Sequence, residues 1–442
     1  RYSAGSGGSG ASGMMRSMLT DTERRALDAL DETALAQTLL ELLAVPSITG
    51  SAAETELLHT LAVRAERLGL EVDLWQDDLA ELRADPDYPG TEAERDELWG
   101  LVAGTEQRDG PTVILQGHVD VVPPGDRAAW SADPFSPVLD GDVVHGRGAC
   151  DMKAGVAANL AALAALRTVE LHGRIALHGR IALHFVASEE DGGLGAFATL
   201  RRGHRGDACL IPEPTALDLI TANCGALTFE LLVPGAAAHG SMRTSGVSAI
   251  EKFLPLFAGL QTLEAARNAS PDPLLAGYEI AAPLSIGQLS SGDWPSTVPD
   301  LLIAKGRYGV LLDEDPSAAR AAFEQRVAEV CAADPWLRGH PATVRWSGGQ
   351  FASGRLPAGH PLRDVVASAH ADTAGSGRPS EHGAPYGSDL RLYAGAGIPT
   401  LHYGPGAPSD AHTSHERVSL ADTVQTARTL IVAALRLTGS SG

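Results

Sequence analysis

The chain has 442 residues, 44% hydrophobic and 20% charged, which fits two or three globular domains. Its 55 acidic and 34 basic residues give a net charge of −21, which would repel nucleic acids and anionic membranes. The longest apolar stretches, at residues 160–166 and 430–435, are much shorter than the roughly 20 residues of a membrane span. We therefore expect no nucleic-acid partner and no membrane partner.

The four cysteines are far apart and form no Cys-x-x-Cys pair, which argues against a disulfide framework and a thiolate zinc site. We therefore expect a cytoplasmic protein. Residues 1–13 are mostly Gly, Ser and Ala, which we interpret as a linker or tag, with the native chain starting at Met14 or Met15.

Apolar residues recur at intervals of three and four from Leu27 to Leu43 and from Ala52 to Leu68, which predicts two amphipathic helices. Short apolar runs bounded by Gly, Pro and Asp predict strands at residues 71–75, 99–103, 112–116 and 181–187, with a helix at 155–166. Strands that alternate with helices are typical of a layered α/β domain.

The pattern changes after Asn223. Strands at 226–233, 285–288 and 303–311, with helices at 247–266 and 316–332, predict an inserted α+β unit. Beyond Val344, a helix at 361–371, a strand at 399–402 and a helix at 420–437 return to the α/β pattern. We therefore predict one α/β domain in two segments, 14–223 and 344–438, and a second domain at 224–343.

The hexapeptide His-Gly-Arg-Ile-Ala-Leu occurs twice in tandem, at residues 172–177 and 178–183. Because six is an even number, a strand shifted by one copy keeps the same side chains facing inward. We expect one copy in the sheet and the spare copy in a loop.

His118 and Asp120 follow the strand predicted at 112–116 and, being two residues apart, lie on the same face. His118 could bind a metal ion through a neutral imidazole while Asp120 accepts the other ring N–H. A plain surface pair is the alternative.

Further acids and imidazoles stand at turns and strand ends. Asp151 follows the glycine-rich turn 146–148 and could bridge two metal ions, although an acid at a helix start is also favoured by the helix dipole. Glu189 and Glu190 could act as proton shuttle and metal ligand, or form a solvated charge run. Glu213, held between two prolines, and His412, in a Gly/Pro-rich loop, could be ligands or ordinary surface residues.

In this order, these motifs resemble those of the M20 metallopeptidases, which include acetylornithine deacetylase, succinyl-diaminopimelate desuccinylase, aminoacylase and glutamate carboxypeptidase. The resemblance extends from about Asp28 to Leu437. It implies an α/β class with a zinc-exopeptidase-like α/β/α catalytic domain at 14–223 and 344–438. It also implies an inserted α+β, ferredoxin-like lid and dimerisation domain at 224–343.

The resemblance implies two zinc ions, with Co²⁺ or Mn²⁺ as substitutes. Asp120 would support the first imidazole ligand, and Glu189 would be the general base acting on a hydroxide that bridges the ions. The implied metal ligands are His118, Asp151, Glu190, Glu213 and His412. His415, three residues beyond the last ligand, is interpreted as a surface histidine.

Two residues of the inserted unit also match the family. The segment 234–241 corresponds to the lid motif whose histidine reaches the oxyanion, in dimeric members from the partner subunit, which implies that His239 stabilises the transition state. Arg307 corresponds to an arginine that contacts the substrate carboxylate, and a structural ion pair is the alternative. Ser248 departs from the asparagine common at that position.

These features predict a dinuclear-metal hydrolase that cleaves the amide bond of an N-acyl amino acid, as a deacetylase or desuccinylase does, and forms a homodimer through the lid domain. The alternative is a dipeptidase or carboxypeptidase, because the same chemistry serves both leaving groups. A metal-free amino-acid-binding protein is a distant alternative, since it would require a broken ligand position and none is seen.

Overall fold

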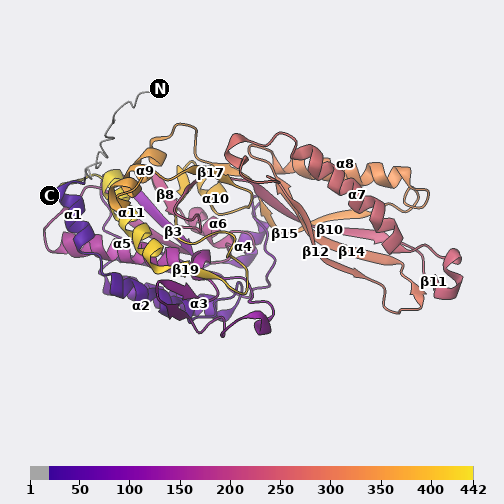
Figure 1. Ribbon diagram of the computed structural model, residues 1–442, viewed down its shortest axis with the longest axis horizontal. Helices are drawn as coiled ribbons and strands as arrows, with labels where there is room; N and C mark the ends of the chain where they lie inside the picture. Colours follow the sequence, from indigo (N-terminus) through magenta and orange to yellow (C-terminus); the bar gives the residue numbers. More distant parts are fainter. Residues whose placement is uncertain (1–18, 442) are drawn as a thin grey trace, which may run out of the picture.

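The computed structural model describes residues 19–441, in which the two largest sheets are placed end to end (Figure 1). We name the part around the larger sheet the main lobe (residues 19–224 and 352–441) and the part around the smaller sheet the inserted lobe (residues 225–351). The predicted linker at 1–13 and the predicted start at Met14 or Met15 lie outside the described residues.

The main lobe contains a nine-stranded mixed sheet in the order β1-β2-β7-β3-β8-β18-β9-β16, with β17 beside β9. In its centre, β3 pairs in parallel with β7 and β8, and β8 pairs in parallel with β18. The strands are β1 (Glu71–Gln76), β2 (Trp99–Gly104), β3 (Thr112–His118), β7 (Arg180–Val186), β8 (Ala208–Ile211), β9 (Leu219–Asn223), β16 (Gly354–Arg355), β17 (Glu381–Ala384) and β18 (Thr400–His402).

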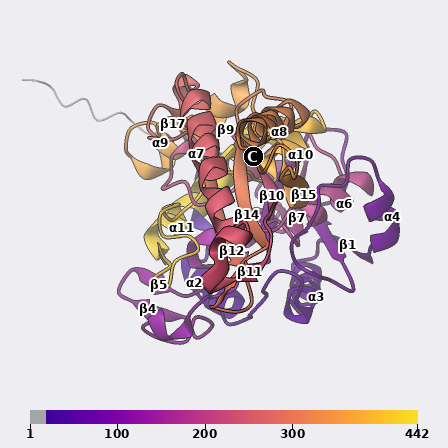
Figure 2. The ribbon, with the colours of Figure 1, turned by 90° about the vertical axis from the view of Figure 1, so that its right-hand side faces the viewer.

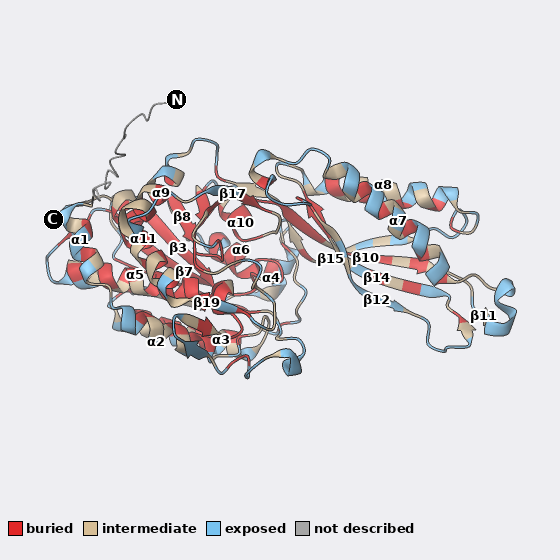
Figure 3. Ribbon diagram, in the orientation of Figure 1, coloured by how far each residue is buried: buried red, intermediate tan, exposed pale blue. Residues whose placement is uncertain are grey.

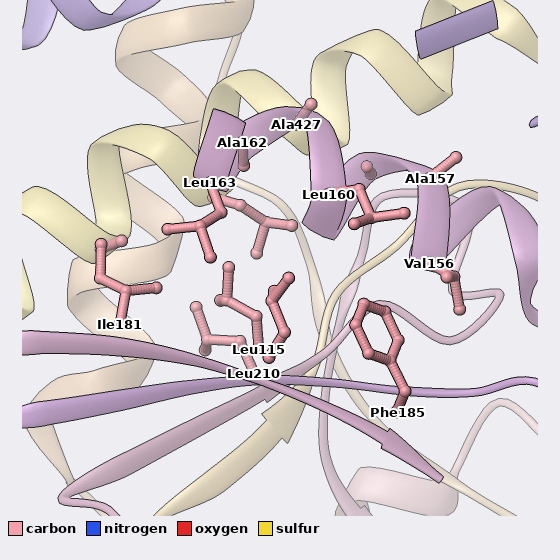
Figure 4. Close-up of a cluster of buried hydrophobic side chains, with 14 of the residues drawn as sticks. Leu115, Val156, Ala157, Leu160, Ala162, Leu163, Ile181, Phe185, Leu210 and Ala427 are labelled. Carbon is pink, nitrogen blue, oxygen red and sulfur yellow. The ribbon is translucent and has the colours of Figure 1, made fainter. Parts of the chain in front are cut away.

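Helices cover both faces of this sheet because its central strands are apolar on both sides. Leu115 of β3 packs in the core under α5 and α11 (Figure 4), and Val113 belongs to the same cluster. Ile114 packs on the opposite face with α6 and α10. The predicted α/β/α class is therefore confirmed. The helices are α5 (Ala154–Leu171), α6 (Leu194–Arg201), α10 (Leu390–Gly395) and α11 (Leu420–Thr438).

Residues 149–171, which include α5, form the only helix in the described part of the chain that is long and apolar enough to cross a membrane. This helix packs against the central strands and against α2 and α11, and 67% of its most apolar window is buried (Figure 3). Its apolar surface is thus accounted for by the core of the main lobe.

The single helix predicted from Leu27 to Leu43 is wrong. The chain forms α1 (Asp21–Asp28) and α2 (Glu32–Leu43) instead, because Asp31 accepts a hydrogen bond from the Ala34 N–H and starts a new helix. The second predicted helix is observed as α3 (Ala52–Arg67).

The inserted lobe follows the element order β-α-β-β-α-β, which confirms the predicted ferredoxin-like unit. Its sheet has the order β12-β14-β10-β15, and α7 and α8 pack together on one face (Figures 1 and 2). The elements are β10 (Gly225–Pro234), α7 (Ala249–Arg267), β12 (Leu284–Ser291), β14 (Leu301–Val310), α8 (Pro316–Ala333) and β15 (Thr343–Phe351).

The returning boundary differs from the one expected at residue 344. β15 pairs with β10 in antiparallel register, from Thr343 opposite Leu232 to Phe351 opposite Ala226. This strand is therefore an edge of the inserted sheet. The chain rejoins the main sheet only with β16, where Gly354 pairs with Asn223.

The second copy of the tandem hexapeptide runs into β7 of the main sheet. The first copy, expected in a loop, forms a turn after α5 and then the short strand β6, which pairs with β20 outside the main sheet. The remaining described elements are α4 (Leu79–Ala84), β4 (Val138–Asp140), β5 (Val143–His145), β6 (Ala176–Leu177), β11 (Ala238–His239), β13 (Thr297–Val298), α9 (Pro361–Ala374), β19 (Arg417–Ser419) and β20 (Ser440–Ser441).

Candidate metal centre

The candidate ligands meet at the carboxyl ends of the parallel strands of the main sheet. His118 is the last residue of β3, Glu190 lies just after β7, and Glu213 lies just after β8. Asp151 comes from the turn before α5, and His412 from the loop after β18. Carboxyl ends of neighbouring parallel strands share one edge of a sheet, and this edge is where α/β proteins place their sites.

Asp151 stands at the centre of this cluster. Its Oδ1 is 3.1 Å from His118 Nε2, and its Oδ2 is 3.4 Å from His412 Nε2. The two carboxylate oxygens therefore face two different imidazoles.

Each imidazole has a second carboxylate of its own. His118 Nε2 is 3.8 Å from Glu213 Oε1, and His412 Nε2 is 3.0 Å from Glu190 Oε2. Ligand atoms of His118, Asp151 and Glu190 all lie within 4.8 Å of one another. The residues thus form two His/carboxylate groups that share Asp151, a donor set that fits a pair of divalent cations.

The cluster concentrates negative charge in a buried place. Glu189, Glu190 and Glu213 are each at most about 7% exposed, and burial together with neighbouring carboxylates raises the pKa of all three. Without other positive charge, such acids would have to take up protons. Bound cations would compensate the charge and keep the carboxylates ionised.

The neighbouring carboxylates also raise the pKa of the two histidines. Although burial opposes it, Glu213, Asp120 and Asp151 raise the pKa of His118 well above its usual value. In the same way, Asp151 and Glu190 raise the pKa of His412 to about 11. Protons on these imidazoles occupy the positions that cations would take.

Asp120 contacts its neighbouring imidazole and also holds the main chain of two glutamates. His118 Nδ1 lies 3.0 Å from the main-chain oxygen of Asp120 and 3.6 Å from the nearer carboxylate oxygen. The carboxylate accepts the N–H groups of Glu189 and Glu190, both at 3.2 Å, and the hydroxyl of Thr49 at 2.9 Å. The expected contact to the imidazole is therefore made mainly by the main chain, and the side chain holds the paired glutamates.

A second buried acid, which the sequence did not single out as functional, holds the turn that carries Asp151. Glu416 accepts the N–H groups of Gly148, Cys150 and Asp151 at 3.0–3.2 Å and pairs with Arg147 at 2.5 Å. Its position directly before β19 gives no local sign of this role.

Glu189 touches the same cavity without belonging to either His/carboxylate group. A cavity of about 250 Å³ is lined by Asp151, Glu189, Glu190, Glu213 and His412. Burial and the nearby charge of Asp389 raise the pKa of Glu189 well above its usual range. Asp389, whose role the sequence left open, is fully buried and accepts a hydrogen bond from Gln116 at 2.7 Å.

Arg307 lies on β14 and reaches the space between the lobes. It lines an adjoining cavity of about 870 Å³ together with Glu189, Glu190 and His412. Its guanidinium donates to the Pro385 oxygen at 2.9 Å and has no ion pair among the described residues. The structure therefore favours a guanidinium that is free to bind a substrate carboxylate over one that is held in a structural ion pair.

His239 is not brought to the cluster within this chain. It ends β11 at the tip of the inserted lobe, at the far end from the main sheet (Figure 1), and it is exposed. Its Nδ1 lies 2.8 Å from the Ser241 hydroxyl. His415 is also exposed and lines neither cavity.

Comparison with known proteins agrees with this geometry. Residues 114–436 match the family model of peptidase family M20/M25/M40. An N-formyl-4-amino-5-aminomethyl-2-methylpyrimidine deformylase of Halalkalibacterium halodurans is 28% identical over 425 residues, covering 90% of this chain and 92% of that protein.

Two other matches cover very different shares of this chain. A succinyl-diaminopimelate desuccinylase of Methylobacterium sp. is 42% identical over 147 residues, covering 30% of this chain and 35% of that protein. The solved structure of the dipeptidase Dug1p of Saccharomyces cerevisiae superposes with a TM-score of 0.73 at 14% identity, covering 94% of this chain and 98% of that one. The structural match shows that the two proteins share a fold.

Proposed function

The chain is a metal-dependent hydrolase that belongs to peptidase family M20/M25/M40, and from this membership we propose that it cleaves the amide bond of an N-acyl amino acid with two divalent metal ions. The observation that carries the proposal is the division of five donors into two groups that share Asp151.

In this proposal His118, Asp151 and Glu213 hold one ion, and His412, Asp151 and Glu190 hold the other. Imidazole and carboxylate donors without a thiolate suit zinc, with Co²⁺ or Mn²⁺ as substitutes. Such an ion pair acidifies water and polarises the scissile carbonyl.

Glu189 acts as the general base. Its carboxylate lines the cavity beside the metal ligands, and its main-chain N–H is fixed by Asp120. Glu189 takes a proton from the attacking water and passes it to the departing amine.

The substrate side is formed by the larger cavity. Arg307 carries an unpaired guanidinium there, which suits the carboxylate of an amino acid. The relatives named as deformylase and desuccinylase remove acyl groups from nitrogen, which supports an N-acyl substrate.

A dipeptidase or carboxypeptidase is the second candidate, because a cavity of about 870 Å³ has room for a second residue. A metal-free binding protein receives no support from five complete donor positions.

We also propose that the chain forms a homodimer through the inserted lobe, with His239 reaching the oxyanion in the partner's site. Eight of the twelve large hydrophobic side chains that are exposed among the described residues lie in the inserted lobe, Leu254 and Trp294 among them. In this proposal the inserted lobe acts as lid and dimerisation domain, and the main lobe forms the catalytic domain. The four buried free thiols support a reducing, cytoplasmic location.

The test is hydrolysis of a substrate panel by the metal-loaded protein and by Glu189→Gln. The panel contains N-formyl, N-acetyl and N-succinyl amino acids, the N-formyl aminopyrimidine and a set of dipeptides. Glu189→Gln should lose 10²-fold or more of kcat while keeping its metal, because only the proton acceptor is removed. Glu66→Gln, an exposed change on α3, should keep full activity. Retained activity in Glu189→Gln would show that another group is the base.

A further inference from the structure

Tyr386 has a buried hydroxyl that no other described group satisfies. Its oxygen is closed off from solvent and makes no hydrogen bond to any of residues 19–441. Buried polar groups in folded proteins nearly always have a partner, so an unsatisfied one calls for an explanation such as a bound ligand.

The residue lies beside the candidate metal centre. Tyr386 lines both the cavity of about 250 Å³ and the adjoining cavity of about 870 Å³, so it stands where the two meet. Burial raises the pKa of its hydroxyl, and the charges of Glu213, Asp151 and Glu189 act in the same direction. We therefore expect the partner that this hydroxyl lacks to be a substrate bound in these cavities.

Other side-chain donors around the smaller cavity are already engaged. Its carboxylates only accept hydrogen bonds when ionised. The Ser388 hydroxyl lies 3.1 Å from His402 Nε2 and accepts from the Leu390 N–H, and the His412 imidazole faces two carboxylates. Among the described residues that line this cavity, Tyr386 is the one uncommitted side-chain donor.

The segment that carries Tyr386 is held on both sides. The Pro385 oxygen accepts a hydrogen bond from Arg307, and Asp389 accepts one from Gln116. Arg391 donates to the Ser388 oxygen at 2.9 Å. A donor on such a fixed segment is oriented before the substrate arrives, which is the condition for electrostatic catalysis.

We propose that Tyr386 is a further catalytic residue, whose hydroxyl donates a hydrogen bond to the oxygen of the scissile carbonyl as that oxygen becomes an oxyanion. The phenol keeps its proton throughout, and the bond strengthens as negative charge develops. This inference rests on the proposed amide hydrolysis. It provides an oxyanion donor within the same chain, in addition to the imidazole expected from a partner.

The chain offers a matched control in Tyr308. Its hydroxyl is also buried without a partner, but it lies in the core of the inserted lobe against Phe323 and lines neither cavity. Tyr308→Phe and Tyr386→Phe therefore each delete a buried, unpartnered hydroxyl, and only Tyr386 lines the cavities beside the metal centre.

The experiment compares both variants with wild type, all metal-loaded, on the best substrate of the panel. Tyr386→Phe should lose roughly 100-fold in kcat with little change in KM. Its affinity for a phosphinic dipeptide isostere, a tetrahedral anion, should fall at least 10-fold, while its affinity for the product amino acid stays unchanged. Its melting temperature without metal should stay equal or rise, because an unsatisfied polar atom is removed. Tyr308→Phe should match wild type in kcat and in phosphinate affinity.

Wild-type kcat and phosphinate affinity in a folded, metal-loaded Tyr386→Phe would overturn the assignment while leaving the hydrolase intact. An equal loss in both variants would assign the effect to general packing and would also overturn it. If wild type hydrolyses nothing in the panel, the proposed function itself fails, and the role of Tyr386 falls with it.

Discussion

At the scale of single residues, the site depends on carboxylates that organise their neighbours through the main chain. Asp120 fixes the N–H groups of Glu189 and Glu190, and the Thr49 hydroxyl donates to the oxygen that also accepts the Glu190 N–H. A shift of this one side chain would move a proposed base and a proposed ligand together. The acid is therefore a positioning residue for both.

A histidine away from the site predicts how stability depends on pH. Burial, with the positive charges of His204 and Arg180, lowers the pKa of His184 to about 3. In the unfolded chain this pKa is about 6.5. Below pH 6.5 the unfolded state therefore binds a proton that the folded state refuses, so the free energy of unfolding falls as the pH falls toward 3.

His184→Gln should remove this dependence while keeping a partner for the Tyr393 hydroxyl, which lies 2.9 Å from His184 Nδ1. The loss of unfolding free energy between pH 7.5 and pH 5 should shrink by about 2 kcal/mol relative to wild type, measured by urea unfolding. His172→Gln changes an exposed histidine twelve residues earlier. This variant should lose as much unfolding free energy between pH 7.5 and pH 5 as wild type does. An unchanged pH dependence in His184→Gln would show that this histidine is protonated in the folded protein.

Much of the candidate site can be predicted from the sequence because its ligands stand at strand ends in short motifs. His118, Asp151, Glu190, Glu213 and His412 were expected there, and the fold brings all five together. Tyr386 and Thr49 could not be recognised in the same way, because their importance comes from which distant groups they meet. A hydroxyl without a partner is visible only once all its neighbours are placed.

At the scale of elements, a glycine and a buried carboxylate hold the turn before α5 in place. Gly148 has φ +82°, and a Cβ there would approach Val121 to 2.7 Å, so the turn requires glycine. The N–H groups that follow it point at Glu416 rather than at solvent. This anchoring gives Asp151 one fixed position between the two imidazoles.

Glu416→Gln tests this anchoring. Removing one charge of the buried Arg147 pair should lower the free energy of unfolding by about 3–5 kcal/mol and weaken metal binding, because the turn loses its charged acceptor. Urea unfolding and calorimetric metal titration measure the two effects. Glu41→Gln, which breaks an exposed pair with Arg64, should lower the unfolding free energy by less than about 1 kcal/mol. Equal effects of the two changes would contradict a special role for the buried acid.

The errors of element prediction have local causes. The periodicity from Leu27 to Leu43 continues through Asp31, and only the capping bond shows that a new helix starts there. β15 has the alternation of any half-exposed strand, so its sequence does not reveal that β10 is its neighbour. Patterns along the chain predict which elements form, whereas pairing across the sheet depends on the rest of the molecule.

At the scale of the whole molecule, the inserted lobe separates His239 from the metal centre of its own chain (Figure 1). A site completed by a partner subunit would account for this separation and for the exposed apolar side chains of the lobe. The domain architecture and the oligomeric state are therefore linked in this account.

Mixing two inactive variants tests that link. Glu189→Gln and His239→Ala should each be inactive alone, and their mixture should recover up to about a quarter of wild-type activity, because some hybrid sites combine an intact base with an intact imidazole. Tandem tags and mass spectrometry would verify that subunits exchange. Verified exchange without recovery would mean that the imidazole acts in its own subunit or not at all.

The central claim, a shared carboxylate between two cation positions, is tested most directly by the metal content of the purified protein and three ligand variants. Elemental analysis after saturation with Zn²⁺ and desalting should find two ions per chain in wild type, one in Glu190→Gln and one in Glu213→Gln. Asp151→Ala should hold none firmly, because its two oxygens serve both groups. A single ion in wild type, or two ions retained without Asp151, would contradict the account.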